Sequence, residues 1–269
     1  MIMKFGLLGA KLGHSLSPQI HQEVFRQLGI DATYELIEVP GDKLKEKTAE
    51  LQKTHRGLNV TIPHNVAVME SRDRIAPEAG AIGAVNTVLF KDGLAEGFNT
   101  DYFGFARLLE HNGLVPQGQE VCVLGTGGAS RAILQCVTDM QAKRITVISR
   151  AIANAPEDIR VRYAVKTYDD LKTMSGDLLI NCTPVGMYPK VDVSPVDGTV
   201  LKNFAAAVDI IYNPAETAFM KLARRQGKPA VNGLFMLVAQ AVAADEIWLE
   251  CKLDAGLIAD VTGKIAKLL

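Results

Sequence analysis

The sequence lacks the features that mark several specialised classes of protein. It has no excess of either charge, because 29 Lys and Arg residues nearly balance 30 Asp and Glu residues. We therefore expect no nucleic acid and no anionic membrane surface as partner. No apolar run is long enough to span a bilayer, and the N-terminus shows no basic start, apolar stretch and cleavage site. These absences predict a cytoplasmic protein.

Metal-binding and disulfide patterns are also missing. The histidines His21, His55 and His111 show no metal-ligand spacing, which favours solvated or capping roles. The cysteines are few, lie far apart and form no C-x-x-C pair, so we expect buried free thiols in a reducing compartment. They are Cys122, Cys136, Cys182 and Cys251. The sequence therefore predicts neither a metal site nor a disulfide framework.

What the 269 residues do contain is an alternation of strand and helix signals, with 48% hydrophobic and 22% charged residues. This pattern predicts an α/β fold with parallel sheets. Asp92-Gly93 between two apolar runs indicates a hairpin. We expect a further helical turn to start at Pro63, and a domain boundary near residues 101–113, where a strand–helix–strand unit begins afresh.

A glycine-rich loop follows the apolar run 120–124 and leads into a helical segment, 129–140. Gly125 permits a tight turn, and Gly127 lets the backbone approach a pyrophosphate, whose charge suits a helix N-terminus. A glycine-rich turn without a ligand is the alternative, but the complete strand–loop–helix–strand order favours a dinucleotide. The second strand ends at Ser149-Arg150 without an acidic residue. Because a guanidinium can pair with a 2′-phosphate, Arg150 favours NADP over NAD.

Three groups of polar motifs lie in the first part of the chain. They are Ser-Leu-Ser-Pro at 15–18, Asn-Val-Thr-Ile-Pro-His-Asn at 59–65, and Gly-Ala-Val-Asn-Thr at 83–87 with Asn-Thr-Asp at 99–101. Hydroxyls and amides suit a polyhydroxylated ligand, because they donate and accept hydrogen bonds in fixed directions. Singly, they could equally be helix caps, with Ser17 before one helix and Asp101 before another.

Together and in this order, these motifs and the glycine loop resemble the shikimate dehydrogenase family over nearly the whole chain. The resemblance implies that Ser15 and Ser17 bind the substrate carboxylate. It implies that the ring hydroxyls and nearby groups are bound by Thr61, Asn86, Asp101, Tyr212 and Gln240. It implies that the cofactor is bound by Gly125, Thr126, Gly127, Gly128, Ala129, Ser149, Arg150, Thr183, Ile210 and Gly233.

The resemblance also implies a two-domain α/β architecture. Residues 1–102 and the returning C-terminal helices, 236–269, would form the substrate-binding catalytic domain. Residues 103–235 would form an inserted Rossmann-type NADP-binding domain, with a cleft that opens and closes. The expected protein is a cytoplasmic NADP-dependent oxidoreductase of aromatic amino acid biosynthesis, the chorismate pathway. It would reduce 3-dehydroshikimate to shikimate reversibly, as a monomer or homodimer.

One position departs from the family pattern. The family has a lysine where this sequence has Asn65, and that lysine relays a proton beside the residue equivalent to Asp101. An amide cannot titrate, so we expect a large loss of turnover, although Asn65 could still donate a hydrogen bond to a substrate oxygen. The adjacent His64 is an unlikely replacement because neighbouring side chains usually point apart. Without a cationic neighbour, the charged form of Asp101 should be disfavoured.

Three functions stay open on this basis. The first is a shikimate dehydrogenase weakened or inactivated at position 65. The second is an enzyme of the same class acting on quinate, or on an amino-shikimate analogue or another cyclohexene carboxylate. The third is a non-catalytic ligand-binding relative, whose only support in the sequence is Asn65. An inactivated variant and a natural relative with another task both agree with an asparagine there.

Overall fold

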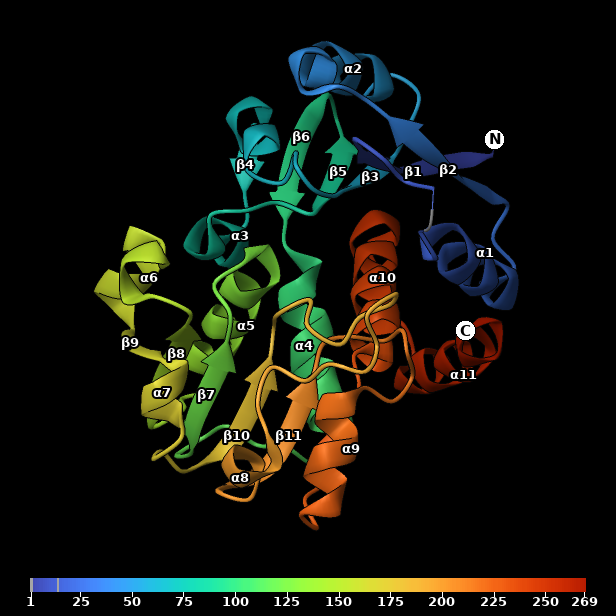
Figure 1. Cartoon of the computed structure of the whole chain (residues 1–269). Helices are drawn as coiled ribbons and strands as arrows, with labels where there is room; N and C mark the ends of the chain where they lie inside the picture. The colour runs from blue at the N-terminus through green and yellow to red at the C-terminus, as the bar shows by residue number, and fades with distance from the viewer. Residues whose placement is uncertain (1, 14) are drawn as a thin grey trace. The chain divides into compact units, whose positions relative to one another are not determined.

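The computed structural model describes residues 2–13 and 15–269. It confirms the expected α/β fold and divides into two compact units. The first unit comprises Met1–Gly104 and Val238–Lys267, and the second comprises Phe105–Leu237 and Leu268–Leu269. Helices α4 (Thr100–His111) and α10 (Leu234–Leu249) each run from one unit into the other (Figure 1). Which unit binds substrate and which binds cofactor stays a prediction at this point.

The first unit is built on a six-stranded sheet in the order β2-β1-β3-β5-β6-β4. Its strands are β1 (Met3–Gly9), β2 (Ala32–Glu38), β3 (Gly57–Val60), β4 (Arg74–Ile75), β5 (Thr87–Lys91) and β6 (Leu94–Phe98). Its helices are α1 (Ser17–Leu28), η1 (Gly41–Lys43), α2 (Leu44–Leu51), η2 (Ala67–Ser71), α3 (Pro77–Ile82), α11 (Ala255–Ile265) and η4 (Ala266–Leu268), the last reaching the second unit, with parts of α4 and α10.

This sheet is mixed, not parallel throughout as the alternating signals predicted. Strand β1 is parallel to β2 and β3, but β5 is antiparallel to both β3 and β6. The reversal occurs at Asp92 and Gly93, whose φ angles of 51° and 78° form the expected hairpin turn. A tight hairpin returns the chain directly beside the strand it leaves, so the two strands must be antiparallel.

Apolar side chains cover both faces of this sheet. One buried cluster includes Phe5 from β1, Phe25 from α1 and Trp248 from α10, and the rings of Phe5 and Trp248 stack with centroids 4.8 Å apart. The other cluster joins the sheet to α2 and α3, with Leu58 of β3 and Leu51 of α2 among its members. The side chains that follow the strands are therefore held on a rigid, fully packed platform.

The second unit has a parallel sheet in the order β12-β11-β10-β7-β8-β9. Its strands are β7 (Glu120–Leu124), β8 (Arg144–Ser149), β9 (Ala164–Thr167), β10 (Gly176–Asn181), β11 (Phe204–Asp209) and β12 (Ala230–Val231). Its further helices are α5 (Gly128–Asp139), η3 (Ile152–Asn154), α6 (Glu157–Arg162), α7 (Tyr168–Leu171), α8 (Gly198–Leu201) and α9 (Ala218–Arg225). The chain runs from β7 outward to β9, then returns beside β7 and runs outward to β12. This strand order is the one found in dinucleotide-binding Rossmann folds.

Several local expectations need correction. No helix starts at Pro63, because residues 62–66 form turns and η2 begins only at Ala67. Cys251 is exposed, whereas the other three cysteines are buried as expected, and all four are free thiols. His21 is fully buried, and not solvated or capping, because it packs among aromatic rings inside the first unit. His55 is also buried, with Nε2 2.8 Å from Glu35 Oε1.

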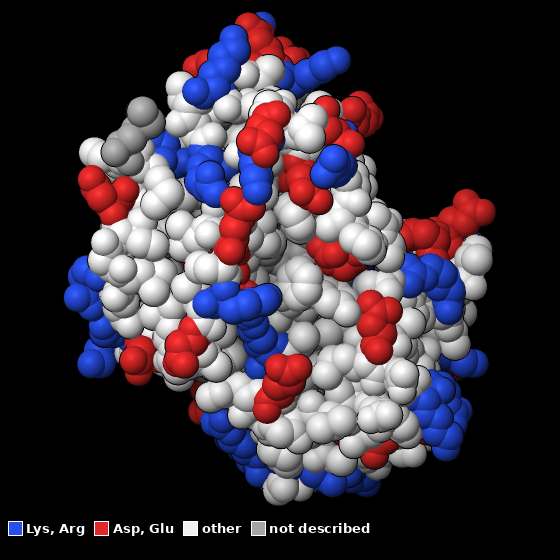
Figure 2. Space-filling model, turned by 180° about the vertical axis from the view of Figure 1, so that it is seen from behind, with Lys and Arg blue, Asp and Glu red and all other residues white. Residues whose placement is uncertain are grey.

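The surface agrees with the balanced composition. On the face drawn in Figure 2, acidic and basic side chains of the described residues are interspersed. Among the described residues, no helix has both the length and the apolar character required to cross a membrane.

Candidate active site

The side chain of Asn86 is fixed by hydrogen bonds at the start of β5. Its Oδ1 accepts from the backbone N–H of Thr100 at 2.7 Å and from the Thr100 hydroxyl at 3.1 Å. The hydroxyl of Thr87 donates to the same oxygen at 3.0 Å. With the oxygen occupied in this way, the amide nitrogen of Asn86 is the end that bonds to the Asp101 carboxylate.

Asp101 lies in the first turn of α4, inside the helix and not before it as a capping residue would be. Burial raises the pKa of its carboxyl to about 6, and the hydrogen bond from Asn86 opposes this rise. The raised pKa agrees with the expectation that the charged form of Asp101 is disfavoured without a lysine beside it. The physical cause is the removal of the carboxylate from water. A carboxyl with a pKa near 6 can both take up and release a proton near neutral pH.

Ser15 and Ser17 lie together at the start of α1. The hydroxyl of Ser15 donates to that of Ser17 at 3.1 Å, and the backbone N–H of Ser17 donates to the Ser15 oxygen at 3.2 Å. Ser17 is the first residue of the helix, and the N-cap position is Leu16, which makes no side-chain cap. The capping alternative for Ser17 is therefore wrong, and both hydroxyls are half-buried beside a helix start.

The side chain of Asn65 is hydrogen-bonded to backbone carbonyl groups. The amide nitrogen of Asn65 donates to the carbonyl oxygens of Val60, at 2.8 Å, and Val85, at 3.2 Å. Both amide hydrogens are thus occupied, so the hydrogen bond to a substrate oxygen expected from the sequence is not available in this conformation. His64 is buried with its Nε2 2.8 Å from Val39 O, which turns it away from Asn65 as expected. Thr61 is half-buried just after β3.

Gln240 and Tyr212 belong to different units. Gln240 lies on α10 in the first unit, where its Oε1 is 3.3 Å from the hydroxyl of Thr100. It therefore joins the cluster formed by Asn86 and Asp101. Tyr212 lies in the second unit, half-buried after β11, where burial raises the pKa of its phenol.

The glycine loop occupies the centre of the parallel sheet in the second unit. Gly125 follows β7 with a φ of 99°, which a residue with a side chain rarely adopts. A Cβ atom added to Gly127 or Gly128 would meet no protein atom within 4 Å. Helix α5 starts at Gly128 with no side-chain cap on its first N–H groups. Thr126 and Ala129 complete a loop with open space and free donors, which fits a pyrophosphate.

The other expected cofactor residues follow the carboxyl ends of neighbouring strands. Ser149 ends β8, and the exposed Arg150 comes next with no acidic residue beside it. Thr183 follows β10, and a Cβ added at Gly125 would lie 3.0 Å from its methyl group. Ligands of open α/β sheets bind along this edge, at the point where the strand order reverses.

Ile210 and Gly233 meet where the chain leaves β11 and β12. A Cβ added to Gly233 would lie 1.9 Å from the carbonyl oxygen of Ile210, so only glycine fits there. The buried Asp209 anchors this region: its carboxylate accepts hydrogen bonds from the Asn181 amide at 3.0 Å and the Thr217 hydroxyl at 2.6 Å. Burial raises the pKa of Asp209 to about 6.

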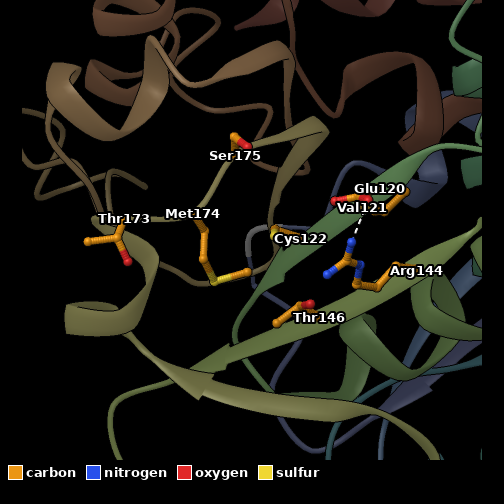
Figure 3. A pocket seen from close by; sticks show the side chains of 8 residues that line it. All are labelled: Glu120, Val121, Cys122, Arg144, Thr146, Thr173, Met174 and Ser175. Carbon is orange, nitrogen blue, oxygen red and sulfur yellow. Dashed lines mark hydrogen bonds and ion pairs between the residues drawn. The ribbon is translucent and has the colours of Figure 1, made fainter.

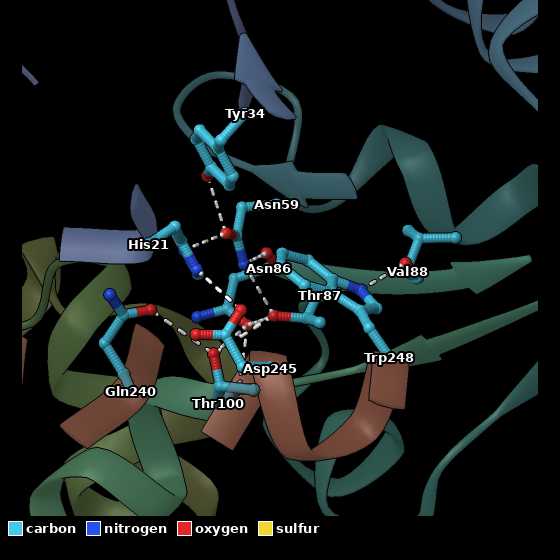
Figure 4. A network of polar contacts seen from close by, with 10 residues as sticks. All are labelled: His21, Tyr34, Asn59, Asn86, Thr87, Val88, Thr100, Gln240, Asp245 and Trp248. Carbon is cyan, nitrogen blue, oxygen red and sulfur yellow. Dashed lines mark hydrogen bonds and ion pairs between the residues drawn. The ribbon is translucent and has the colours of Figure 1, made fainter. Parts of the chain in front are cut away.

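A buried network beside the cluster of Asn86, Asp101 and Gln240 was missed from the sequence (Figure 4). His21 Nδ1 is 2.8 Å from Asp245 Oδ1, and His21 Nε2 is 3.1 Å from Asn59 Oδ1. Tyr34 donates its hydroxyl to the same Asn59 oxygen at 2.7 Å. His21 precedes Asp245 by 224 residues, and no local spacing links them. The only available signal was that Asn59 stands in the same motif as Thr61 and Asn65.

A separate hollow of about 270 Å³ lies at the amino ends of β7 and β8 (Figure 3). Glu120 and Arg144 line it and form an ion pair at 2.6 Å. It is at the sheet edge opposite to the glycine loop and contains none of the expected site residues. Across residues 2–13 and 15–269, no group of three or more His, Cys, Asp or Glu side chains could hold a metal ion.

Comparisons with known proteins agree with this geometry. Residues 7–88 match the family model described as the shikimate dehydrogenase substrate binding domain. A shikimate dehydrogenase (NADP(+)) from Clostridium beijerinckii is 45% identical over 252 residues, which cover 93% of each chain. One from Bacillus cereus is 40% identical over 253 residues, 91% of each chain.

Solved structures show the same likeness over the whole chain. A chorismate mutase/shikimate 5-dehydrogenase fusion protein from Clostridium acetobutylicum matches with a TM-score of 0.96 and 44% identity, covering 99% of this chain and 98% of that one. Shikimate 5-dehydrogenase from Thermus thermophilus, in complex with NADP(H) and shikimate, matches with a TM-score of 0.88 and 31% identity over 98% and 99% of the two chains. Identity at this level over nearly the full length shows common descent, and the chain therefore belongs to the shikimate dehydrogenase family.

Proposed function

We propose that this protein is an NADP-dependent shikimate dehydrogenase that interconverts 3-dehydroshikimate and shikimate, with turnover reduced by Asn65. The observation that supports this most is the cluster of Asn86, Asp101 and Gln240 in the first unit. Asn86 bonds directly to Asp101, and Thr100 links Asn86 to Gln240. The relative from Thermus thermophilus binds NADP(H) and shikimate. The expected setting is the cytoplasmic biosynthesis of aromatic amino acids.

The substrate would be held by residues of the first unit. The paired hydroxyls of Ser15 and Ser17 at the start of α1 suit a carboxylate, because hydroxyls donate to it and the helix N-terminus is positive. Asn86 and Gln240 present amides whose orientation is set by Thr100. Fixed amides and a carboxylate discriminate ring hydroxyls, because a misplaced hydroxyl leaves a buried polar group without a partner.

The cofactor would be held by the second unit. The residues fit NADP: the open space at Gly127 and Gly128 admits a pyrophosphate, and Arg150 suits the 2′-phosphate. Thr183, Ile210 and Gly233 would lie beside the nicotinamide. NADP supplies the acceptor or donor of the hydride, and the protein residues orient the substrate and handle its proton.

Proton transfer in this chain would rest on Asp101. Oxidation of a hydroxyl to a ketone releases a proton, and Asn65 has no titratable group with which to take it. Asp101 has a pKa of about 6 and is oriented by Asn86, so it can accept the proton near neutral pH. General acid–base catalysis contributes about 10²–10⁴-fold to a rate, and part of that contribution is lost without the lysine.

The test is the rate of NADPH formation from shikimate and NADP⁺ by this protein and by Asn65→Lys. We expect the lysine variant to be at least about 10²-fold faster in kcat, with a smaller change in KM. Asn65→Met is the matched control, because it has a similar length to lysine without a charge, and it should not gain activity. A lysine variant no faster than the methionine variant would contradict the role proposed for position 65.

A non-catalytic ligand-binding protein is the second candidate, and one observation favours it. Both amide hydrogens of Asn65 bond to backbone carbonyls, so this residue serves the structure of the loop. Tight binding of NADPH and shikimate with no activity restored in Asn65→Lys would support this candidate. A binding panel of shikimate and quinate separates the first candidate from an enzyme with another cyclohexene carboxylate as substrate.

A further inference from the structure

A buried polar pair lies behind the substrate cluster, outside every role proposed above. His21 of α1 and Asp245 of α10 are both fully buried, and their nearest atoms are 2.8 Å apart. The His21 ring stacks on Tyr34 with centroids 4.2 Å apart and lies 5.3 Å from the Trp248 ring. Burying such a pair is costly, and apolar residues of similar size often stabilise a fold equally well. Its presence next to a site therefore suggests a purpose beyond stability.

The hydrogen bonds of this pair determine how many protons it holds. Asn59 accepts through Oδ1, since its Nδ2 donates to Thr87 at 3.0 Å and lies 3.4 Å from the Asn86 carbonyl oxygen. If the side-chain amide of Asn59 were rotated by 180°, its Oδ1 would face the carbonyl oxygen of Asn86, and neither oxygen could donate a hydrogen bond. His21 must therefore donate from Nε2 to Asn59, and one more proton lies between its Nδ1 and Asp245. His21 therefore presents an N–H to Asn59 and shares a second hydrogen bond with Asp245.

From Asn59, a series of hydrogen bonds runs through Thr87 and Thr100 to the side-chain amides of Asn86 and Gln240 (Figure 4). Asn59 donates to Thr87, whose hydroxyl donates to Asn86 Oδ1 at 3.0 Å. The Thr87 hydroxyl also lies 3.0 Å from that of Thr100, which bonds to Gln240 Oε1 at 3.3 Å. Because each hydroxyl has one hydrogen, Thr87 donates either to Asn86 or to Thr100, and the Thr100 backbone N–H holds the Asn86 oxygen in both cases. The chain ends on two amides, both of which receive hydrogen bonds on their oxygens.

We propose that His21 and Asp245 are positioning residues that set the orientation of the Asn86 and Gln240 amides through Asn59, Thr87 and Thr100. This inference rests on the proposed function, because it assigns the two amides to the ring hydroxyls of shikimate. The N–H on His21 Nε2 and the backbone carbonyl of Asn86 together hold Asn59 with its Nδ2 toward Thr87. Asn86 then turns its nitrogen toward Asp101, and Gln240 keeps its oxygen on Thr100.

Asp245→Leu tests the first link with little change in volume. Leucine can neither donate to nor accept from His21 Nδ1, so this ring nitrogen loses its partner and the ring is no longer held against Asn59. We expect the Kd for shikimate to rise about 10-fold, as for one buried polar group left unpaired. The Kd for NADPH should change less than about twofold, because its residues lie in the other unit.

Thr100→Val tests the last link, and Thr48→Val is its matched control. Thr48 is also buried and also donates its hydroxyl, to Leu44 O at 2.6 Å, but it lies in α2 outside the chain. Thr100→Val should weaken shikimate binding, and its effect combined with Asp245→Leu should be less than the product of the two. Thr48→Val should leave the affinity for shikimate unchanged.

Two results would overturn the inference: an unchanged shikimate Kd in Asp245→Leu, or equal losses in Thr48→Val and Thr100→Val. If the parent protein binds no shikimate, the proposed function fails and the positioning role is read from NMR. The His21 ring should then show two slowly exchanging N–H protons in the parent and one in Asp245→Leu. The side-chain amide signals of Asn59 and Asn86 should shift in the variant, and unshifted signals would exclude the positioning role.

Discussion

The side-chain nitrogen of Asn65 lies 2.8 Å from the carbonyl oxygen of Val60. The same amide reaches Val85, whose backbone N–H in turn donates to the carbonyl oxygen of Asn65 at 2.9 Å. Asn65 therefore ties the segment after β3 to the segment before β5. A residue used in this way stabilises the loop that carries Thr61.

The first prediction concerns Asp101 and stability. Its pKa of about 6 is above the ordinary value of 3.8, so the folded protein binds this proton more tightly than the unfolded chain. Stability must therefore fall as the pH rises from about 4 to about 6, and the loss persists above that range. Asp101→Asn should remove this loss and stabilise the protein by about 1–3 kcal/mol at pH 8, but not at pH 3.

Urea unfolding at both pH values measures this difference. Asp260→Asn, on the exposed side of α11, is the control. It should leave the difference in unfolding free energy between pH 8 and pH 3 as it is in the parent protein. In the background of Asn65→Lys, Asp101→Asn should also reduce kcat by about 10²-fold or more. A destabilised Asp101→Asn protein at pH 8 would show that the carboxylate is stabilised, not strained, by its surroundings.

The second prediction concerns the choice of cofactor. Arg150→Gln removes the only cation directly after β8, and with it a charge-assisted hydrogen bond to a 2′-phosphate. The Kd for NADPH should rise about 10–100-fold while that for NADH stays nearly constant. Arg144→Gln, at the other end of the same strand, should change neither affinity. Equal losses for both cofactors in Arg150→Gln would argue against a 2′-phosphate at this position.

The third prediction compares two glycines of the second unit. In Gly233→Ala the new Cβ would lie 1.9 Å from Ile210 O, so we expect a loss of about 2–3 kcal/mol in unfolding free energy. In Gly127→Ala the new Cβ meets no protein atom and the φ of −78° suits alanine. Stability should then change by less than about 1 kcal/mol. The affinity for NADPH should nevertheless fall about 10-fold, because the methyl group occupies the phosphate space. Unchanged NADPH binding in Gly127→Ala would place the pyrophosphate elsewhere.

The sequence predicted the features that depend on neighbouring residues. The glycine loop, the Asp92-Gly93 hairpin and the strand before Arg150 each have a local signal, because turn conformation and helix starts are set within a few residues. The resemblance to the family added the order of the motifs.

Other features depend on contacts between distant segments, and no local pattern carries them. The burial of His21 follows from helix α10 arriving 224 residues later with Asp245. The backbone bonds of Asn65 require Val85 from another strand connection. The antiparallel half of the first sheet follows from the pairing of β3 with β5, which is set by tertiary packing.

A crystal structure of the full chain grown with shikimate and NADP⁺ tests the central claim most directly. We expect the shikimate carboxylate at the hydroxyls of Ser15 and Ser17, with its ring hydroxyls at Asn86, Asp101 and Gln240. We expect the pyrophosphate at the loop that begins with Gly125. A structure at saturating concentrations in which both ligands are absent from these residues, or bound at other positions, would contradict the proposed function.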